Sequence, residues 1–246
     1  ADYPVPGLKE TGFITSDDVL EMREAPESII VLGAGAVAVE LAQFLLRIGV
    51  KVTLLQRSPH ILSKGDEDLA QPVEHQFRQE GMNLFTDTKI LRAKKEQEGS
   101  AVYFQHEGEE KRVCAQVILQ ALGRRPNSDG LDLESAGVET QQGRINVDAK
   151  MKTNQPHIFA VGDVNGIHEV VHIAILQGEV AGYNAVHPEN EREVDDRLKS
   201  SVVFTAPAVA SVGLSEKECQ AENIAYLVAS YPFDDHGKSM CLGETH

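Results

Sequence analysis

The sequence has few cysteines, few basic residues and no long apolar run. Three cysteines occur among 246 residues, far apart and without C-x-x-C or zinc-ligand spacing: Cys114, Cys219 and Cys241. An odd, sparse set of this kind is typical of a reducing cytoplasm. We therefore expect each thiol to be packed or incidental rather than part of a disulfide framework or a metal site.

Basic side chains are outnumbered, with 23 Lys and Arg against 38 Asp and Glu and a formal net charge of −15. This acidic balance disfavours a nucleic-acid partner or an anionic membrane surface. No apolar run approaches the length of a membrane span, and no signal peptide opens the chain. We therefore expect a cytoplasmic protein with no membrane or nucleic-acid partner.

The sequence does contain a glycine-rich turn between a buried strand and a helix. Residues 29–32 are apolar and mostly β-branched, which predicts a buried parallel strand, and Gly33 and Gly35 interrupt it. Residues 51–55 read as a second strand, so the whole stretch predicts a βαβ unit. The apolar positions that recur at helical spacing between the two strands are Val37, Leu41, Phe44, Leu45 and Ile48.

In this context G-x-G-x-x-A is a dinucleotide-binding pattern. Gly33 makes the tight turn, and Gly35 lets the backbone approach a pyrophosphate. The N-terminus of the helix supplies free N–H groups and a partial positive charge. The alternative is a purely structural strand–helix turn.

The loop after residues 51–55 indicates which dinucleotide is preferred. An acidic residue there would favour NAD, but this sequence has neutral Gln56 followed by Arg57. An arginine suits a 2′-phosphate, and Ser58 adds a hydroxyl donor. Ala38 in place of a third glycine points the same way. We expect NADP to be preferred over NAD; the alternative is that Arg57 is only a solvated surface residue.

Apolar patterning predicts strands and helices along the rest of the chain. The expected strands are residues 83–90, 101–106, 111–113, 116–123, 144–148, 157–163, 201–205, 209–213 and 226–231. The expected helices are a short one ending near Arg23, residues 66–81, residues 169–185, and a short one that begins with a capping box at Ser215. We expect the charged residues 94–98 to form a solvated turn and no helix to close the chain.

Two of these expected strands end in residues of interest. Gly123 ends a strand beside the glycine-rich one, where the rest of a dinucleotide would pass, although the steric need of a turn explains this glycine equally well. Asp163 ends another strand, where a carboxylate can accept hydrogen bonds from polyol hydroxyls. The helix after it would stabilise negative charge at its N-terminus.

Taken together, four segments resemble the flavin-dependent pyridine nucleotide–disulfide oxidoreductases, which include dihydrolipoamide dehydrogenase, glutathione reductase and mercuric reductase. The segments are residues 29–40, 123–127, 158–163, and 202–205 with 209–213. The resemblance implies an α/β fold in which a Rossmann-like NAD(P) domain (25–115, a parallel sheet with helices plus a β-meander) is inserted in a FAD domain. Residues 1–24 would be the crossover of the FAD domain and 116–190 its second part. Residues 195–246 would begin an α+β dimerisation domain.

The resemblance also implies an activity and a set of site residues. Hydride would pass from NAD(P)H to FAD and on to a disulfide or related small-molecule substrate, in a homodimeric parent protein. Gly33, Gly35 and Ala38 would cradle the pyrophosphate, and Glu40 would lie near the nicotinamide, unless it is only a surface carboxylate. The remaining residues implied at the cofactors are Ala36, Val37, Gln56, Arg57, Ser58, Ile90 and Gly123 for the dinucleotide, and Asp163, Glu169, Val170, Val171 and His172 for FAD. From residue chemistry alone, His172 is expected to be a satisfied buried histidine.

Several parts of the family pattern are missing from this sequence. It has no first FAD-binding βαβ unit, no redox-active C-x-x-x-x-C pair and no C-terminal His–Glu pair, and none of its three cysteines stands at the redox position. We therefore expect an internal fragment of a longer protein that by itself neither turns over a disulfide nor holds FAD tightly, but still binds NADP(H). The alternatives are a non-catalytic dinucleotide-binding module, a flavin-dependent NAD(P)H oxidase or reductase without a redox disulfide, and a structural fragment held by dimerisation.

Overall fold

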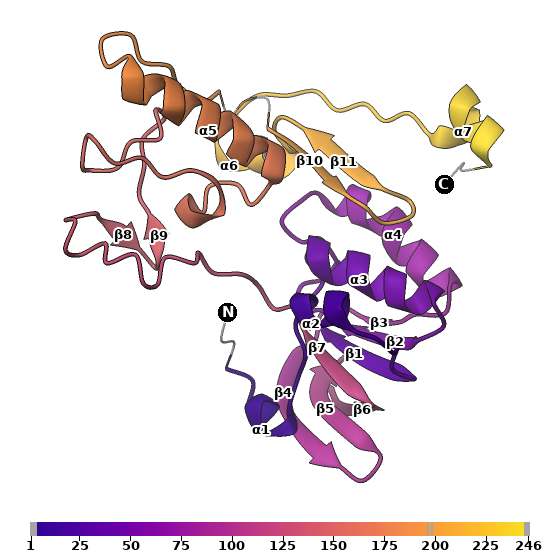
Figure 1. Ribbon diagram of the computed structural model, residues 1–246. Coiled ribbons are helices and arrows are strands. Elements are labelled where there is room, and N and C mark those ends of the chain that lie inside the picture. The colour runs from indigo at the N-terminus through magenta and orange to yellow at the C-terminus, as the bar shows by residue number, and fades with distance from the viewer. Residues whose placement is uncertain (1–3, 196, 198, 244–246) are drawn as a thin grey trace. The chain divides into compact units, whose positions relative to one another are not determined.

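The computed structural model describes residues 4–195, 197 and 199–243, which form two compact units (Figure 1). Unit 1 consists of Ala1–Gly123, Val202–Ser211 and Ser215–His246. Unit 2 consists of Arg124–Ser201 and Val212–Leu214. The outermost residues of the first and last expected domains, 1–3 and 244–246, lie outside the described part of the chain.

A four-stranded parallel sheet forms the centre of unit 1. Its strands are β1 (Ser28–Leu32), β2 (Lys51–Leu55), β3 (Asn83–Phe85) and β7 (Val117–Gln120), in the order β3-β2-β1-β7. Residues 29–32 of β1 are fully buried, as the apolar run predicts, because β1 is a central strand covered on both faces. The expected βαβ unit and Rossmann-like arrangement are confirmed.

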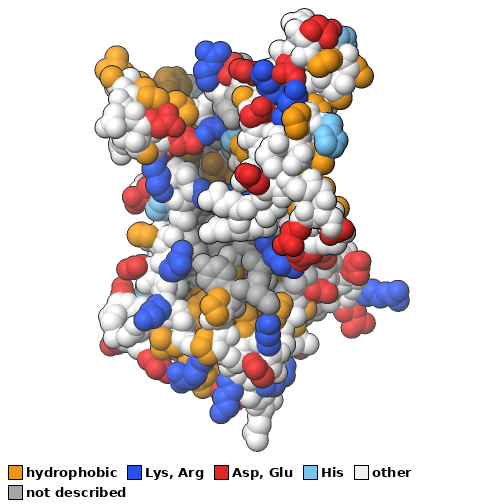
Figure 2. Space-filling model, turned by 90° about the vertical axis from the view of Figure 1, so that its left-hand side faces the viewer, with side chains coloured by type: hydrophobic (Ala, Val, Ile, Leu, Met, Phe, Trp, Pro, Cys, Tyr) orange, Lys and Arg blue, Asp and Glu red, His pale blue; other side chains and the backbone are white. Residues whose placement is uncertain are grey.

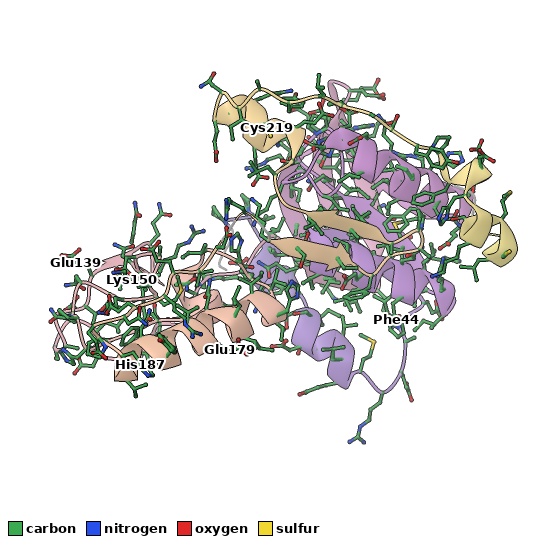
Figure 3. All side chains as sticks on the ribbon, turned by 90° about the horizontal axis from the view of Figure 1, so that it is seen from above. Phe44, Glu139, Lys150, Glu179, His187 and Cys219 are labelled. Carbon is green, nitrogen blue, oxygen red and sulfur yellow. The ribbon has the colours of Figure 1, made fainter. Side chains whose placement is uncertain are left out.

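Helix α3 (Ala36–Arg47) packs on this sheet through a face that only partly overlaps the predicted one, with Leu45 common to both. The buried residues of α3 are Ala38, Val39, Ala42, Gln43 and Leu45. Of the predicted face, Phe44 (labelled in Figure 3) is 53% exposed and Ile48 is 50% exposed. The alanines on the buried side allow the helix to lie close against the sheet. The prediction missed them because it counted only large apolar residues. Helix α4 (Glu67–Gln79), which falls within the helix expected at residues 66–81, buries Ala70, Val73 and Phe77.

An antiparallel meander extends unit 1. It consists of β4 (Lys89–Glu96), β5 (Gly99–His106) and β6 (Glu109–Ala115), so the expected β-hairpin and meander are confirmed. The single strand expected at 83–90 is wrong: β3 and β4 belong to different sheets, and Asp87, with φ of 51°, turns the chain between them. The solvated turn expected at 94–98 is wrong for residues 94–96, which continue the edge strand β4. Two short helices, α1 (Leu8–Thr11) and α2 (Ser16–Glu21), precede β1.

Unit 2 has little regular strand structure. A two-stranded sheet joins β8 (Thr140–Gln141) to β9 (Arg144–Ile145), and the 16-residue helix α5 (Val171–Val186) follows a 3₁₀ turn, η1 (Gly162–Asn165). The strand expected at 157–163 is wrong, because within the described residues it forms only the single bridge between Lys152 and Phe159. Its apolar residues instead pack in a small cluster with Val138 and Ile145, without a strand ladder.

The C-terminal segment confirms some expected elements and corrects others. Strands β10 (Ser200–Val203) and β11 (Val209–Val212) pair with each other, and Ser215 begins α6 (Glu216–Ala221) with a capping box to Glu218. Residues 226–231 form no strand, since their apolar side chains, such as the fully exposed Leu227, have no partner strand in the described chain. Contrary to expectation, a short helix, α7 (Gly237–Leu242), follows the 3₁₀ turn η3 (Phe233–Asp235).

None of the helices in the described ranges has the length and apolar character needed to cross a bilayer. On the face shown in Figure 2, basic and acidic side chains lie among one another. The net negative charge is therefore not gathered into one patch on that face.

Candidate functional site

The glycine-rich turn lies at the carboxyl ends of β1 and β7. Gly33 has φ of 98°, and a Cβ at this position would lie 2.5 Å from the carbonyl oxygen of Ala121. The N–H of Gly33 donates to Leu55 O (2.9 Å), and the N–H of Ala121 donates to Leu32 O (3.0 Å). Only glycine therefore fits at position 33, and the turn brings together the ends of three neighbouring strands.

The N-terminus of α3 is exposed next to this turn. Gly35 is its N-cap, with no side-chain cap, and Gly35, Ala36 and Val37 are exposed while Ala38 is buried. A Cβ built on Gly35 meets no atom within 4 Å. The first N–H groups of a helix have no intrahelical partner, so this open end presents backbone donors and the positive end of the helix dipole to an anion.

The loop after β2 is held by hydrogen bonds within the loop and by bonds from the chain that follows β3. The side chain of Gln56 is buried, and its Nε2 donates to His60 O and Ser63 Oγ (both 3.4 Å). Arg57 is exposed, and the carbonyl of Ser58 accepts the N–H of Asp87 (2.9 Å). Of the two residues expected to decide between NADP and NAD, Gln56 thus points into its own loop, whereas the side chain of Arg57 lies at the surface.

Two further candidate residues lie in different settings. Ile90 is half-buried on β4 and packs against the second apolar core of unit 1 together with Phe104. Gly123 follows β7, is exposed, has φ of 139° and leaves open space where a Cβ would be. Gly123 is therefore at the same sheet edge as Gly33, while Ile90 contributes to packing.

Glu40 and Gln43 on α3 hold the chain that follows β10. Glu40 Oε1 accepts the N–H of Phe204 (2.8 Å). The amide of Gln43 makes two bonds with Ala206, donating to its carbonyl (2.9 Å) and accepting its N–H (2.8 Å). Glu40, expected near a nicotinamide, therefore has a backbone partner in this structure.

In unit 2, the turn that carries Asp163 is organised by a fully buried glutamine. Gln177 Oε1 accepts from Gly162 N (2.7 Å) and Asn165 Nδ2 (2.9 Å), while its own Nε2 is buried and has no hydrogen-bond partner among the described residues. The carboxylate of Asp163 remains nearly half exposed and pairs through Oδ2 with Arg124 (2.8 Å). These contacts fix the backbone on both sides of Asp163 and leave its side chain accessible.

The residues expected at the flavin lie at the start of α5. Val170 is its N-cap without a side-chain cap, and Glu169 and Val171 are exposed. His172 is exposed rather than buried, and its Nε2 lies 3.0 Å from Ser200 O and 2.9 Å from Ser200 Oγ. The expected burial of His172 is wrong because position 172 faces away from the buried side of α5, which carries Ile173 and Gln177.

The three thiols show no reactive grouping in the described structure. Cys219 on α6, labelled in Figure 3, is buried, Cys114 is partly buried and Cys241 is exposed, and all three are free. No group of three or more His, Cys, Asp or Glu side chains among the described residues is arranged to hold a metal ion.

Comparison with known proteins decides the family. The family "Pyridine nucleotide-disulphide oxidoreductase" matches residues 1–178, and its dimerisation domain matches residues 199–246. This chain belongs to the pyridine nucleotide–disulphide oxidoreductase family. The fold class, a Rossmann-like α/β unit followed by the start of a dimerisation domain, is confirmed by the same matches.

Individual relatives within the family have different enzymatic activities. A mercuric reductase of Staphylococcus aureus is 31% identical over 242 residues, covering 98% of this chain and 44% of that protein. A dihydrolipoyl dehydrogenase of Mycobacterium tuberculosis is 35% identical, covering 98% of this chain and 52% of that protein. The chain thus spans about half the length of the curated relatives it matches.

Solved structures show the same relation. The HOCl-induced flavoprotein disulfide reductase RclA from Escherichia coli superposes with a TM-score of 0.85 at 25% identity, covering the whole of this chain and 56% of that one. LpdA from Mycobacterium tuberculosis gives a TM-score of 0.82 at 25% identity over 94% of this chain.

The structure brings together only part of the predicted set. Gly33, Gly35 and Gly123 share one sheet edge in unit 1, and Asp163 lies near the turn that Gln177 organises in unit 2. Sequence reasoning missed Gln177 and the backbone partner of Glu40. A polar residue among small and apolar residues on α5 is the signal that could have revealed Gln177.

Proposed function

We propose that this chain supplies the pyridine-nucleotide site, and part of the flavin site, of a FAD-dependent NAD(P)H oxidoreductase. The observation that carries the proposal is the open N-terminus of α3 beside Gly33 and Gly35, at the carboxyl edge of a parallel sheet. In such a sheet this edge is where dinucleotides bind, with the pyrophosphate at the helix N-terminus. In this proposal residues 25–115 are the NAD(P) domain, inserted between the FAD-domain segments 1–24 and 116–190.

The nucleotide we propose is NADP(H). An exposed Arg57 follows a buried, neutral Gln56, so no carboxylate at this loop end would repel a 2′-phosphate. Ser58 lies next to Arg57 and adds a hydroxyl to the same loop. Glu40 then belongs near the nicotinamide in the bound state, which requires its carboxylate to leave or share the N–H of Phe204.

The FAD-facing residues of unit 2 fit a flavin cofactor in their chemistry. The carboxylate of Asp163 is accessible to polyol hydroxyls, and the uncapped N-terminus of α5 offers N–H groups and a positive dipole end beside residues 169–172. A bound flavin would supply the redox chemistry, that is, uptake of hydride from the nicotinamide and transfer of electrons to the substrate. The residues of this chain would hold the ribityl chain and favour negative charge on the reduced ring.

We further propose that the whole protein is a cytoplasmic homodimer that reduces or oxidises a disulfide or a related small molecule. The match of residues 199–246 to the family's dimerisation domain supports the homodimer, and the activities named for the relatives support this class of substrate.

Replacing Gly35 tests the nucleotide site. Gly35 has φ of −75° and open space around its Cβ position, so Gly35→Val fits the folded chain but fills the space a pyrophosphate would occupy. We expect unaltered protein to bind NADPH in calorimetric titration and Gly35→Val to weaken that binding at least about a hundredfold, equivalent to roughly 3 kcal/mol.

Gly178→Ala, at an open helical position on α5, serves as the control and is expected to bind NADPH normally. A folded Gly35→Val variant that binds NADPH as well as the unaltered chain contradicts the proposed site. Tighter binding of NADH than of NADPH by the unaltered chain contradicts the proposed preference alone.

A further inference from the structure

The carboxylate of Asp66 caps a helix other than its own. Asp66 is the N-cap residue of α4 but makes no side-chain capping bond to that helix. Its Oδ2 instead accepts the N–H of Glu216 (3.0 Å), and its Oδ1 accepts the N–H of Lys217 (3.1 Å), both in the first turn of α6. An aspartate at an N-cap ordinarily satisfies the N–H groups of its own helix. Here the same side chain ties together two segments that are 150 residues apart in sequence.

A third hydrogen bond, made by the side chain of Lys217, joins the same two segments. Lys217 Nζ donates to the carbonyl of Ser63 (2.9 Å). The loop between β2 and α4 therefore has two separate attachments to α6, one through Asp66 and one through Ser63. Both segments belong to unit 1, and α6 lies within the part of the chain that matches the dimerisation domain.

From Ser63 the contacts lead back to the residues that select the nucleotide. Ser63 Oγ accepts from Gln56 Nε2 (3.4 Å), and Gln56 is the neighbour of Arg57. The loop is also attached to the glycine-rich turn, since the N–H of Leu62 donates to Ala34 O (2.8 Å). The path from α6 to Arg57 thus runs through Ser63 and the buried amide of Gln56.

We propose that Asp66 and Lys217 are positioning residues that set the loop carrying Arg57, so that α6 determines how strongly this protein prefers NADPH over NADH. The inference rests on the proposed nucleotide site and deepens it. Asp66 and Lys217 do not touch the nucleotide themselves; they act through the loop. Loss of their bonds lets residues 63–66 shift, which weakens the hold on the 2′-phosphate more than the hold on the pyrophosphate.

Nucleotide titrations of position 66 variants test this. We expect Asp66→Ala to raise the Kd for NADPH about five- to tenfold while the Kd for NADH changes less than twofold, the effect of about one lost hydrogen bond. Asp66→Asn keeps one acceptor oxygen and should restore part of the affinity. Arg57→Ala removes the proposed phosphate partner itself and so shows the largest loss of NADPH affinity to be expected at this loop.

Asp68→Ala is the matched control, because Asp68 is an exposed carboxylate in the first turn of the same helix. Should Asp66→Ala fail to fold, Lys217→Met is measured in its place, with an expected rise in the NADPH Kd of about two- to threefold. An unchanged NADPH Kd in the folded variants overturns the inference, and so does an equal loss of NADPH and NADH, which marks a merely structural role. If the unaltered chain binds neither nucleotide, the proposed function itself has failed, and the inference fails with it.

Discussion

Among single residues, Glu80 should make the stability of unit 1 depend on pH. Its carboxylate accepts from Arg47 Nη2 (2.6 Å), Gln76 Nε2 (2.9 Å) and Gln43 Nε2 (3.3 Å). The hydrogen bond from Arg47, followed by those from Gln76 and Gln43, holds the pKa of Glu80 below its usual 4.5, although partial burial opposes this. Because the folded state binds the proton less tightly than the unfolded state, the stabilisation is complete above about pH 4.5. It is lost as the pH falls through the lowered folded-state pKa.

Replacing Glu80 with glutamine should therefore matter at neutral pH and not in acid. We expect Glu80→Gln to lower the free energy of unfolding by about 1 kcal/mol at pH 7, measured by urea unfolding with circular dichroism. The difference from the unaltered chain should shrink below pH 4.5. Glu109→Gln, at an exposed position on β6, provides the control, and a difference for Glu80→Gln that persists at low pH contradicts the assignment.

For single residues, the sequence predicts where the backbone must adopt an unusual conformation better than it predicts which side chains will contact one another. The turn at Gly33 follows from the sequence, because a strand that runs into G-x-G needs a conformation that other residues resist. The hydrogen-bond partners of Gln56 and His172 do not follow, since they depend on how the loop after β2 folds back and on where Ser200 lies.

Among the helices and strands, α3 shows the largest difference between the apolar positions predicted from the sequence and the residues that are buried. This helix was predictable from apolar spacing, but its buried side consists of Ala38, Val39, Ala42 and Leu45 together with the polar Gln43. The central strand β1 was predicted best, since its residues 29–32 are apolar throughout and fully buried. The strands expected at 157–163 and 226–231 were wrong, because an apolar run indicates burial or contact but does not supply a partner strand.

Two neighbouring residues of α3, both among the positions predicted from apolar spacing, differ sharply in burial. Leu45 is 1% exposed in the core against the sheet, whereas Phe44 is 53% exposed. We expect Leu45→Ala to lower the free energy of unfolding by about 2–5 kcal/mol and Phe44→Ala by less than about 1 kcal/mol, measured by chemical denaturation of this chain. The opposite order would show that Phe44, and not Leu45, lies in the core against the sheet.

At the scale of the molecule, the two proposed cofactor regions fall in different units of the chain. Gly33, Gly35 and Arg57 all lie in unit 1, and Asp163 and residues 169–172 all lie in unit 2. The order of the motifs along the sequence already separated them. The return of residues 202–211 and 215–243 to unit 1 was not predictable, because it depends on long-range bonds such as that from Phe204 to Glu40.

This separation predicts where NADPH will protect the chain. Ligand binding stabilises the folded region that makes the contacts, and amides there exchange with solvent more slowly. We expect hydrogen–deuterium exchange with saturating NADPH to slow in peptides from residues 29–66 and 117–123, and to remain unchanged in α5 and around β8 and β9. Because Asp66 joins the nucleotide loop to α6, peptides from residues 215–221 should also slow, and they should not do so in Asp66→Ala. Protection of α5 without protection of residues 29–66 would place the nucleotide in the wrong unit and contradict the assignment of the site.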